Sequence, residues 1–322
     1  MNNLREAISH LRLDEQHYQV DFEKTADWEA IDQEPFSFAH TLTGNPLLSI
    51  NRLAELSEKV FDRPDYKRYY SAQEKSLSKQ HLMSRLRNDI LNIETNGRWL
   101  AMHYIDEMDQ EYEKLFDEVL SALELASGVD IRNKMTWGSM SVFMNAPLLV
   151  VPYHFDHESN FLMQVKGQKF VRLYPRGTAT LTEPEIEDFY RHNPVAGKFR
   201  PGMEDEGKLF VLTPGLGVHQ PPLAPHLIRN GATASISVAV YYTLPETERR
   251  AHVYQVNYLM RKLGINPKSP GESIFWDRAK EKLMLALSIS SPETHDEVLY
   301  SGIERLIAPF RYVKNLKVIK KQ

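Results

Sequence analysis

Apolar residues recur at helical spacing near both ends of the chain and at strand spacing in its middle. Residues 109–125 carry one apolar stripe, with acidic residues in the first turns and Gly128 at the end, which predicts a helix packed on a core. Residues 98–105 alternate between apolar and polar, as a strand does. Weaker patterns predict helices at 3–13 and 53–61, and helix or loop at 76–93.

Residues 135–243 have the pattern of β structure. Short apolar runs are separated by turns rich in Gly and Pro, which is typical of a sandwich or barrel. The polar segment 183–206, with three prolines, interrupts this pattern and is interpreted as an insertion or surface loop. The predicted strands are 142–144, 148–151, 161–165, 170–174, 209–212 and 234–242.

The chain after residue 244 returns to helical spacing. Three helices are predicted, at 247–263, 276–289 and 295–307, and together they exceed what is needed to cap a barrel. The sequence therefore predicts three units. These are an N-terminal extension packed on the core (1–134), a β core (135–243) and a C-terminal helical unit (244–322).

Composition excludes several classes of function. The formal net charge is -4 and the pI is about 6.3, which argues against general nucleic-acid binding. The absence of cysteine excludes disulfides and thiolate metal sites, and it fits a cytoplasmic setting. A polar N-terminus and the lack of an apolar run near the ~20 residues of a membrane helix predict no membrane insertion.

The candidate chemistry begins at the His-Phe-Asp sequence of residues 154–156. In a strand, residues two apart project from the same face, so His154 and Asp156 would point into one pocket. A third ligand would complete a site of two histidines and one carboxylate, which is typical of non-haem Fe(II) oxygenases with open coordination positions. The segment 214–230 offers His226 as the best candidate and His219 as its rival.

A lysine follows this motif in a segment that is interpreted as a hairpin. Strands at 160–165 and 169–174 would flank a turn at 166–168. If the face that carries Lys169 lines the interior, its buried ammonium needs an anion, such as the far carboxylate of 2-oxoglutarate. If the strand is turned over, Arg172 lies inside instead, and the residues alone leave both possibilities open.

The segment resembles the JmjC or cupin-type oxygenases that depend on Fe(II) and 2-oxoglutarate. In particular it is similar to the asparaginyl hydroxylase of hypoxia-inducible factor and its bacterial relatives. Two motif blocks carry the resemblance, and the matching region covers roughly residues 137–242. They read His154, Asp156, Asn160, Gln164, Lys166-Gly167, Lys169 and Leu173-Tyr174-Pro175, then Pro214-Gly215, Val218, Pro221-Pro222 and Ala224-Pro225-His226.

The resemblance implies a mainly β protein with flanking helices and a double-stranded β-helix (jelly-roll, cupin) core. It implies that His154, Asp156 and His226 bind Fe(II), that Lys169 binds 2-oxoglutarate and that Asn160 lies near both. Dioxygen would be the oxidant. His219 is then not the ligand, and His157 would lie behind the ligands or at the surface. The 183–206 insertion would sit near the mouth of the pocket.

The resemblance further implies hydroxylation of an unactivated C–H bond, with a peptide or protein side chain as the expected substrate and a homodimer formed by the C-terminal helices. Three departures concern the co-substrate pocket: Val151 where relatives often carry Thr, Ala224-Pro225 before the distal histidine, and Ala239 on the last strand. Two alternatives remain open. One is a hydroxylase of a free amino acid or natural-product intermediate, and the other is a non-catalytic metal-binding cupin scaffold.

Overall fold

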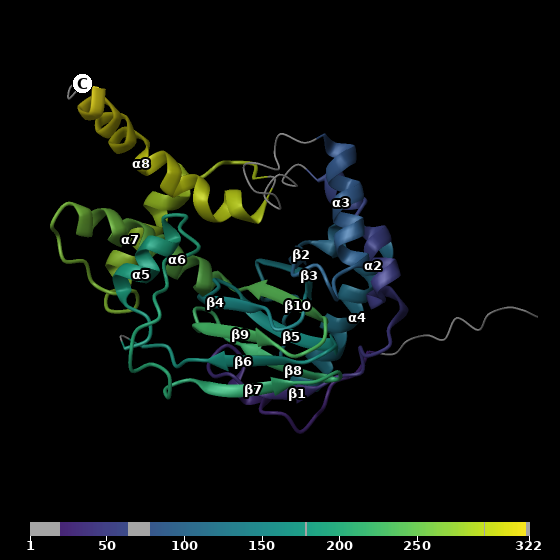
Figure 1. Ribbon diagram of the computed structural model, residues 1–322. Coiled ribbons are helices and arrows are strands. Elements are labelled where there is room, and N and C mark those ends of the chain that lie inside the picture. Colours follow the sequence, from purple (N-terminus) through teal and green to yellow (C-terminus); the bar gives the residue numbers. More distant parts are fainter. Residues whose placement is uncertain (1–19, 64–77, 178, 293, 320–322) are drawn as a thin grey trace, which may run out of the picture.

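The computed structural model describes residues 20–63, 78–177, 179–292 and 294–319, with side chains up to residue 308. Its centre is a pair of antiparallel sheets that face each other, with helices at both ends (Figure 1). The larger sheet has the order β1 (Ser37–Ala39), β8 (Leu216–Gln220), β5 (Ser159–Lys166), β10 (Ser235–Thr243), β3 (Trp137–Asn145), β2 (Trp99–Met102). The smaller has the order β4 (Val150–His154), β9 (His226–Asn230), β6 (Lys169–Leu173), β7 (Lys208–Leu212).

The connections between these strands define the architecture. From β3 to β10 the chain crosses between the sheets at every step except β6 to β7, so β3, β5, β8 and β10 form one wall and β4, β6, β7 and β9 the other. Two strand pairs wound around each other in this way form a double-stranded β-helix, or jelly roll. The predicted fold class is confirmed.

The predicted hairpin at 160–174 is wrong. Strand β5 pairs with β8 and β10, whereas β6 pairs with β7 and β9, so the chain crosses from one sheet to the other at Gly167. Gly167 has a φ of +73°, and an added Cβ would lie 2.4 Å from the Ala234 carbonyl oxygen. The turn residues were visible in the sequence, but the choice of partner strand depends on tertiary packing.

The N-terminal extension covers the outer face of the larger sheet. Helix α4 (Gln110–Ser127) begins at the Asp109 cap and ends at Gly128 in the left-handed conformation, as the stripe predicted. Its apolar face shares one core with Phe161 and Val240 of the sheet. Helices α2 (Ile50–Leu56) and α3 (Lys79–Leu91) lie beside it, with short 3-10 turns at 28–30, 46–48, 59–62 and 105–107. The helix predicted at 3–13 lies outside the described residues.

The C-terminal helices gather at the opposite end of the sheets (Figure 1). They are α6 (Pro245–Lys262), α7 (Ile274–Leu287) and α8 (His295–Ile319), and α5 (Glu183–Tyr190) from the 183–206 insertion packs against α6. A bidentate ion pair between Arg261 and the buried Glu187 joins these last two helices. Within the described ranges, no helix combines the length and apolar character needed to cross a bilayer.

Candidate metal centre

The end of β4 and the start of β9 bring together the three side chains of the predicted triad. His154 and His226 are cross-strand partners, and their ring centroids are 4.1 Å apart. His226 Nε2 lies 3.6 Å from Asp156 Oδ2, and one ligand atom from each of the three residues falls within 4.8 Å of the others. Among the residues that the structure describes, this is the one cluster of His, Cys, Asp and Glu side chains that meets this geometry.

The backbone orients both imidazole rings. The Nδ1 atom of His154 is 2.7 Å from the Pro152 carbonyl oxygen, and that of His226 is 3.1 Å from the Ala224 carbonyl oxygen. Because a carbonyl only accepts, each Nδ1 is the donor, and in the neutral ring this leaves the lone pair on Nε2. Metal-binding histidines are commonly fixed by such bonds on the opposite ring nitrogen.

Local irregularity at the end of β4 aims these residues inward. The β4–β9 register shifts between Val151 and His154, where Pro152 has no N–H to donate. Such irregularities bend a strand and redirect its side chains, often beside active sites. Burial and the neighbouring His154 lower the pKa of His226 to about 4, so this ring is neutral near pH 7 and able to act as a ligand.

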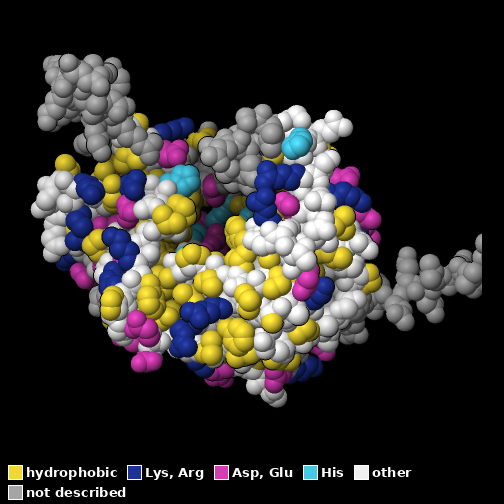
Figure 2. Space-filling model, in the orientation of Figure 1, with side chains coloured by type: hydrophobic (Ala, Val, Ile, Leu, Met, Phe, Trp, Pro, Cys, Tyr) yellow, Lys and Arg dark blue, Asp and Glu magenta, His cyan; other side chains and the backbone are white. Residues whose placement is uncertain are grey.

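Two connected hollows meet at the triad. The inner one is a small pocket of about 60 Å³ between the sheets, and the outer one is a cavity of about 730 Å³. Figure 2 shows a hollow between the two groups of helices, with acidic and histidine side chains visible in its depth. The inner pocket is lined by His154, Asp156, Asn160, Lys169, Gln220 and His226, among others.

Lys169 lies inside the barrel, at the end of the inner pocket. It shares the buried face of β6 with Val171 and Leu173, whereas Arg172 points outward to the carbonyl oxygens of Glu204 and Gly207. This orientation decides the question that the sequence left open. Burial lowers the pKa of Lys169 to about 7, and its ammonium lies 5.7 Å from the centre of the Phe143 ring. No acidic side chain in the described ranges forms an ion pair with it.

The β9 backbone sets the distance between the triad and Lys169. His226 begins β9 opposite Leu173 of β6, and Asn230 ends β9 opposite Lys169. Four residues of strand correspond to about 13 Å between Cα atoms. The flexible lysine side chain shortens this gap, so a small dicarboxylate can reach from a metal at the triad to the ammonium.

Asn160 also lies in the inner pocket, as predicted, and is joined by a residue that the sequence reasoning missed. Gln220 is the cross-strand partner of Asn160, and both side chains are buried. A possible signal was the strand alternation in 216–220, which places Gln220 on the same face as the buried Val218 and on the face opposite His219.

Neither rival histidine belongs to the triad. His219 packs between Phe36 and Phe161 on the outer face of the larger sheet, where its Nε2 accepts from the backbone N–H of Asp32. His157 is buried, and its Nδ1 lies 2.8 Å from the Tyr190 hydroxyl of α5. The expectation that His219 is not the third ligand therefore agrees with the geometry, because the ring lies on the wrong face of its strand.

The outer cavity has aromatic walls and one acidic side chain close to the triad. Trp99, Tyr104, Trp137 and Tyr241 line it, and Trp137 stacks on His295 of α8 with ring centroids 4.1 Å apart. Burial, and then the charge of Asp156, raise the pKa of Glu158 to about 8. Pro194 also lines this cavity, which places part of the 183–206 insertion at its wall.

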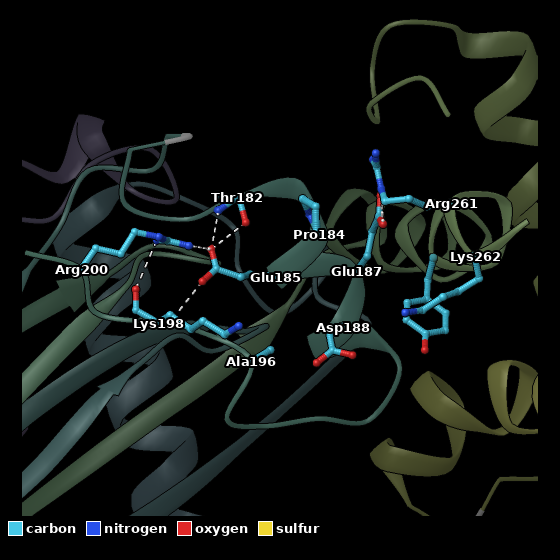
Figure 3. Close-up of a pocket in the computed structure, with 11 residues that line it drawn as sticks. Thr182, Pro184, Glu185, Glu187, Asp188, Ala196, Lys198, Arg200, Arg261 and Lys262 are labelled. Atoms are coloured by element: carbon cyan, nitrogen blue, oxygen red, sulfur yellow. Dashed lines mark hydrogen bonds and ion pairs between the residues drawn. The ribbon is translucent and has the colours of Figure 1, made fainter. Parts of the chain in front are cut away.

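A separate pocket of about 360 Å³ lies between α5 and α6 (Figure 3). Its acidic groups are held by neighbouring cations, since Glu185 accepts from Arg200 and Glu187 from Arg261. It shares no lining residue with the triad. The Glu185–Arg200 pair lies within the 183–206 insertion, and the Glu187–Arg261 pair joins the insertion to α6.

Comparisons with known proteins gave likenesses among solved structures. No family model matches, and no curated protein matches. The ribosomal oxygenase YcfD from Escherichia coli, in complex with cobalt and 2-oxoglutarate, is 17% identical with a TM-score of 0.32, over 61% of this chain and 48% of that one. Another YcfD structure is 15% identical with a TM-score of 0.40, over 85% of this chain and 69% of that one.

A cupin superfamily protein from Desulfitobacterium hafniense is 10% identical with a TM-score of 0.24, over 45% of this chain and 77% of that one. The first YcfD structures are matched over only about half of their length, 48% and 49% in two of them. Likeness at this level says nothing of activity, which depends on the residues of the site.

Proposed function

We propose that this protein is an Fe(II)- and 2-oxoglutarate-dependent oxygenase that hydroxylates an unactivated C–H bond. The observation that carries the proposal is the placement of two histidines and one carboxylate in front of a buried lysine that has no ion-pair partner among the described residues. This donor set leaves coordination positions open and suits Fe(II). The lysine supplies the charge that a dicarboxylate needs at its far end.

In the proposed function, residues of the chain bind and orient the metal and the co-substrate and exclude water from them. His154, Asp156 and His226 would hold the metal through their Nε2 and carboxylate oxygen atoms, and Lys169 would bind the distal carboxylate of the co-substrate. Fe(II) with the 2-oxo acid would supply, when bound, electrons for the activation of dioxygen, which is the oxidant. The apolar walls of the inner pocket, such as Leu162 and Ile228, exclude water from the reacting groups.

The proposed substrate is a peptide or protein side chain. The outer cavity is about twelve times as large as the inner pocket, at about 730 Å³ against 60 Å³, and it opens to solvent in Figure 2. Such a cavity accepts a side chain presented by a longer chain. A hydroxylase of a free amino acid or natural-product intermediate is the second candidate. The narrower resemblance to the asparaginyl hydroxylase remains a hypothesis about the substrate.

The experiment that tests the proposal is a turnover assay with the unchanged protein. With Fe(II), ascorbate, 2-oxoglutarate and dioxygen, the protein should form succinate slowly even without a prime substrate, and peptide libraries should accelerate this reaction. A protein that binds metal but neither binds nor consumes 2-oxoglutarate would instead be a metal-binding scaffold.

We also propose that the chain forms a homodimer through α7. Three consecutive apolar side chains at the start of this helix are well exposed, Ile274 at 68%, Phe275 at 73% and Trp276 at 54%. Exposed apolar groups of this size often mark an interface. We predict that Phe275→Asp shifts the protein from dimer to monomer in light scattering, whereas Leu125→Asp, at an exposed position on α4, does not. A monomeric unchanged protein would contradict the proposal.

A further inference from the structure

We propose that Gln220 positions the co-substrate at the metal end of the inner pocket. In this inference its side-chain N–H donates to the metal-proximal carboxylate of a bound 2-oxo acid, and Asn160 holds the glutamine side chain in place. The inference rests on the proposed function and adds to it a residue that distinguishes 2-oxo acids from simple dicarboxylates.

The two amides form a buried pair with unused hydrogen-bonding groups. Asn160 is 5% exposed and Gln220 is 3% exposed, and Asn160 Nδ2 donates to Gln220 Oε1 at 3.4 Å. In the described part of the chain, Gln220 Nε2 and Asn160 Oδ1 have no hydrogen-bond partner. Buried polar groups are nearly always satisfied, so a donor left unpaired in a pocket points to a ligand or water that accepts from it.

The presence of an unused donor does not depend on how the two amides are oriented. In the orientation of the structure the unused donor is Gln220 Nε2, whereas turning both amides by 180° would make it Asn160 Nδ2. Both orientations leave one donor and one acceptor for whatever fills the pocket, and we propose the orientation of the structure, with Gln220 as the donor. A ligand carboxylate can accept a hydrogen bond from the N–H group, and a water molecule can donate one to the carbonyl oxygen.

The pair lies at the metal end of the pocket and not at the lysine end. Asn160 is the second residue of β5, four positions after Asp156, and Tyr241 is its partner on β10. Lys169 follows the crossing at the other end of β5, beyond Lys166. A 2-oxo acid with its far carboxylate on Lys169 therefore presents its 2-oxo-carboxylate end to Gln220.

Substitutions at Gln220 and at Lys169 should consequently differ in which ligands they weaken. 2-Oxoglutarate carries both the distal carboxylate and the 2-oxo-carboxylate group, whereas succinate lacks the 2-oxo-carboxylate group. A substitution at Gln220 should weaken the binding of 2-oxoglutarate but not that of succinate. A substitution at Lys169 should weaken the binding of both.

The test uses the full chain loaded with Co(II), without dioxygen, and measures binding of 2-oxoglutarate and succinate by calorimetry. For Gln220→Leu and Gln220→Glu we expect 2-oxoglutarate to bind about ten- to a hundredfold more weakly, as for a lost hydrogen bond to a charged group. Succinate affinity should change by less than about twofold for Gln220→Leu. Gln80→Leu, at an exposed position on α3, is the matched control and should bind as the unchanged protein does.

Gln220→Glu guards against a simple loss of folding, because its carboxylate can still accept from Asn160 Nδ2 while the donor is lost. Unfolding temperature and Co(II) affinity should therefore stay close to those of the unchanged protein. Normal 2-oxoglutarate binding by Gln220→Glu, or an equal loss of succinate binding by Gln220→Leu, would overturn the inference. Absence of 2-oxoglutarate binding by the unchanged protein would instead overturn the proposed function itself.

Discussion

Asp156→Ala is expected to abolish metal-dependent formation of succinate and to weaken metal binding by more than about a hundredfold. Loss of residues that merely orient a ligand costs ten- to a hundredfold, so loss of a ligand itself should cost more. The carboxylate lies 3.6 Å from the His226 ring nitrogen, and it is the one anionic member of the triad. Without it, two imidazole rings remain to hold a divalent cation.

Metal affinity by calorimetry and succinate by mass spectrometry measure this effect. His154→Ala and His226→Ala should behave in the same way, whereas His81→Ala, at an exposed position on α3, should bind metal and turn over normally. Retention of full metal affinity by Asp156→Ala would show that the metal, if any, binds elsewhere.

Lys169→Met is expected to have opposite effects on stability and on binding. Lys169 is 2% exposed and its ammonium lies 5.7 Å from the centre of the Phe143 ring, so its replacement by an apolar side chain of similar length should stabilise the empty protein. The same change removes the cation that receives the distal carboxylate. We expect 2-oxoglutarate binding to fall by more than about a hundredfold, as for the loss of a buried charge pair.

Chemical denaturation measures the first effect and calorimetry the second. Lys166→Met is the matched control, because Lys166 is exposed beside the same turn and should change neither quantity appreciably. A Lys169→Met protein that binds 2-oxoglutarate normally would contradict the role of this lysine.

The low pKa of Lys169 makes the stability of the empty protein depend on pH in a defined direction. Burial lowers the pKa to about 7 from the usual 10.5, so between these values the unfolded chain holds a proton that the folded, empty protein has lost. Stability from this group is therefore lower near pH 7 and rises as the pH increases toward 10.5. Lys169→Met should lack this rise.

Ligand binding should depend on pH in the opposite direction. A bound dicarboxylate keeps the ammonium protonated, so binding takes up a proton above pH 7 and weakens by up to about tenfold per pH unit. Calorimetry in buffers of different ionisation enthalpy measures the proton uptake directly.

Local patterns predicted much of what the structure contains. The stripe of 109–125 and its flanking residues predicted α4 to within two residues at either end, because a helix satisfies its hydrogen bonds within one segment. The His-x-Asp spacing predicted that His154 and Asp156 face one pocket, and they do, although β4 ends at His154 and Asp156 lies just after it. The motif match, rather than any local rule, selected His226 over His219.

Other features of the structure could not be predicted from local sequence patterns. The segments 160–165 and 169–174 were expected to pair with each other, and instead they belong to two different sheets, because turn residues specify a change of direction but not the partner across it. The side of β6 that faces inward was open for the same reason, since both faces carry a cation. Gln220 was missed because its proposed role depends on its contact with Asn160, which is distant in the sequence.

The sequence by itself determined most of the helices, several of the core strands and the candidate ligands, since these follow from periods of two and of 3.6 residues and from a short motif. Only the tertiary structure decided that His226 meets the 154/156 pair, that Lys169 rather than Arg172 lies inside, and that Gln220 joins them. The physical reason is that each of these facts depends on strand pairing between distant segments. Such pairing is set by how the two sheets bury their apolar faces together, and no single segment contains that information.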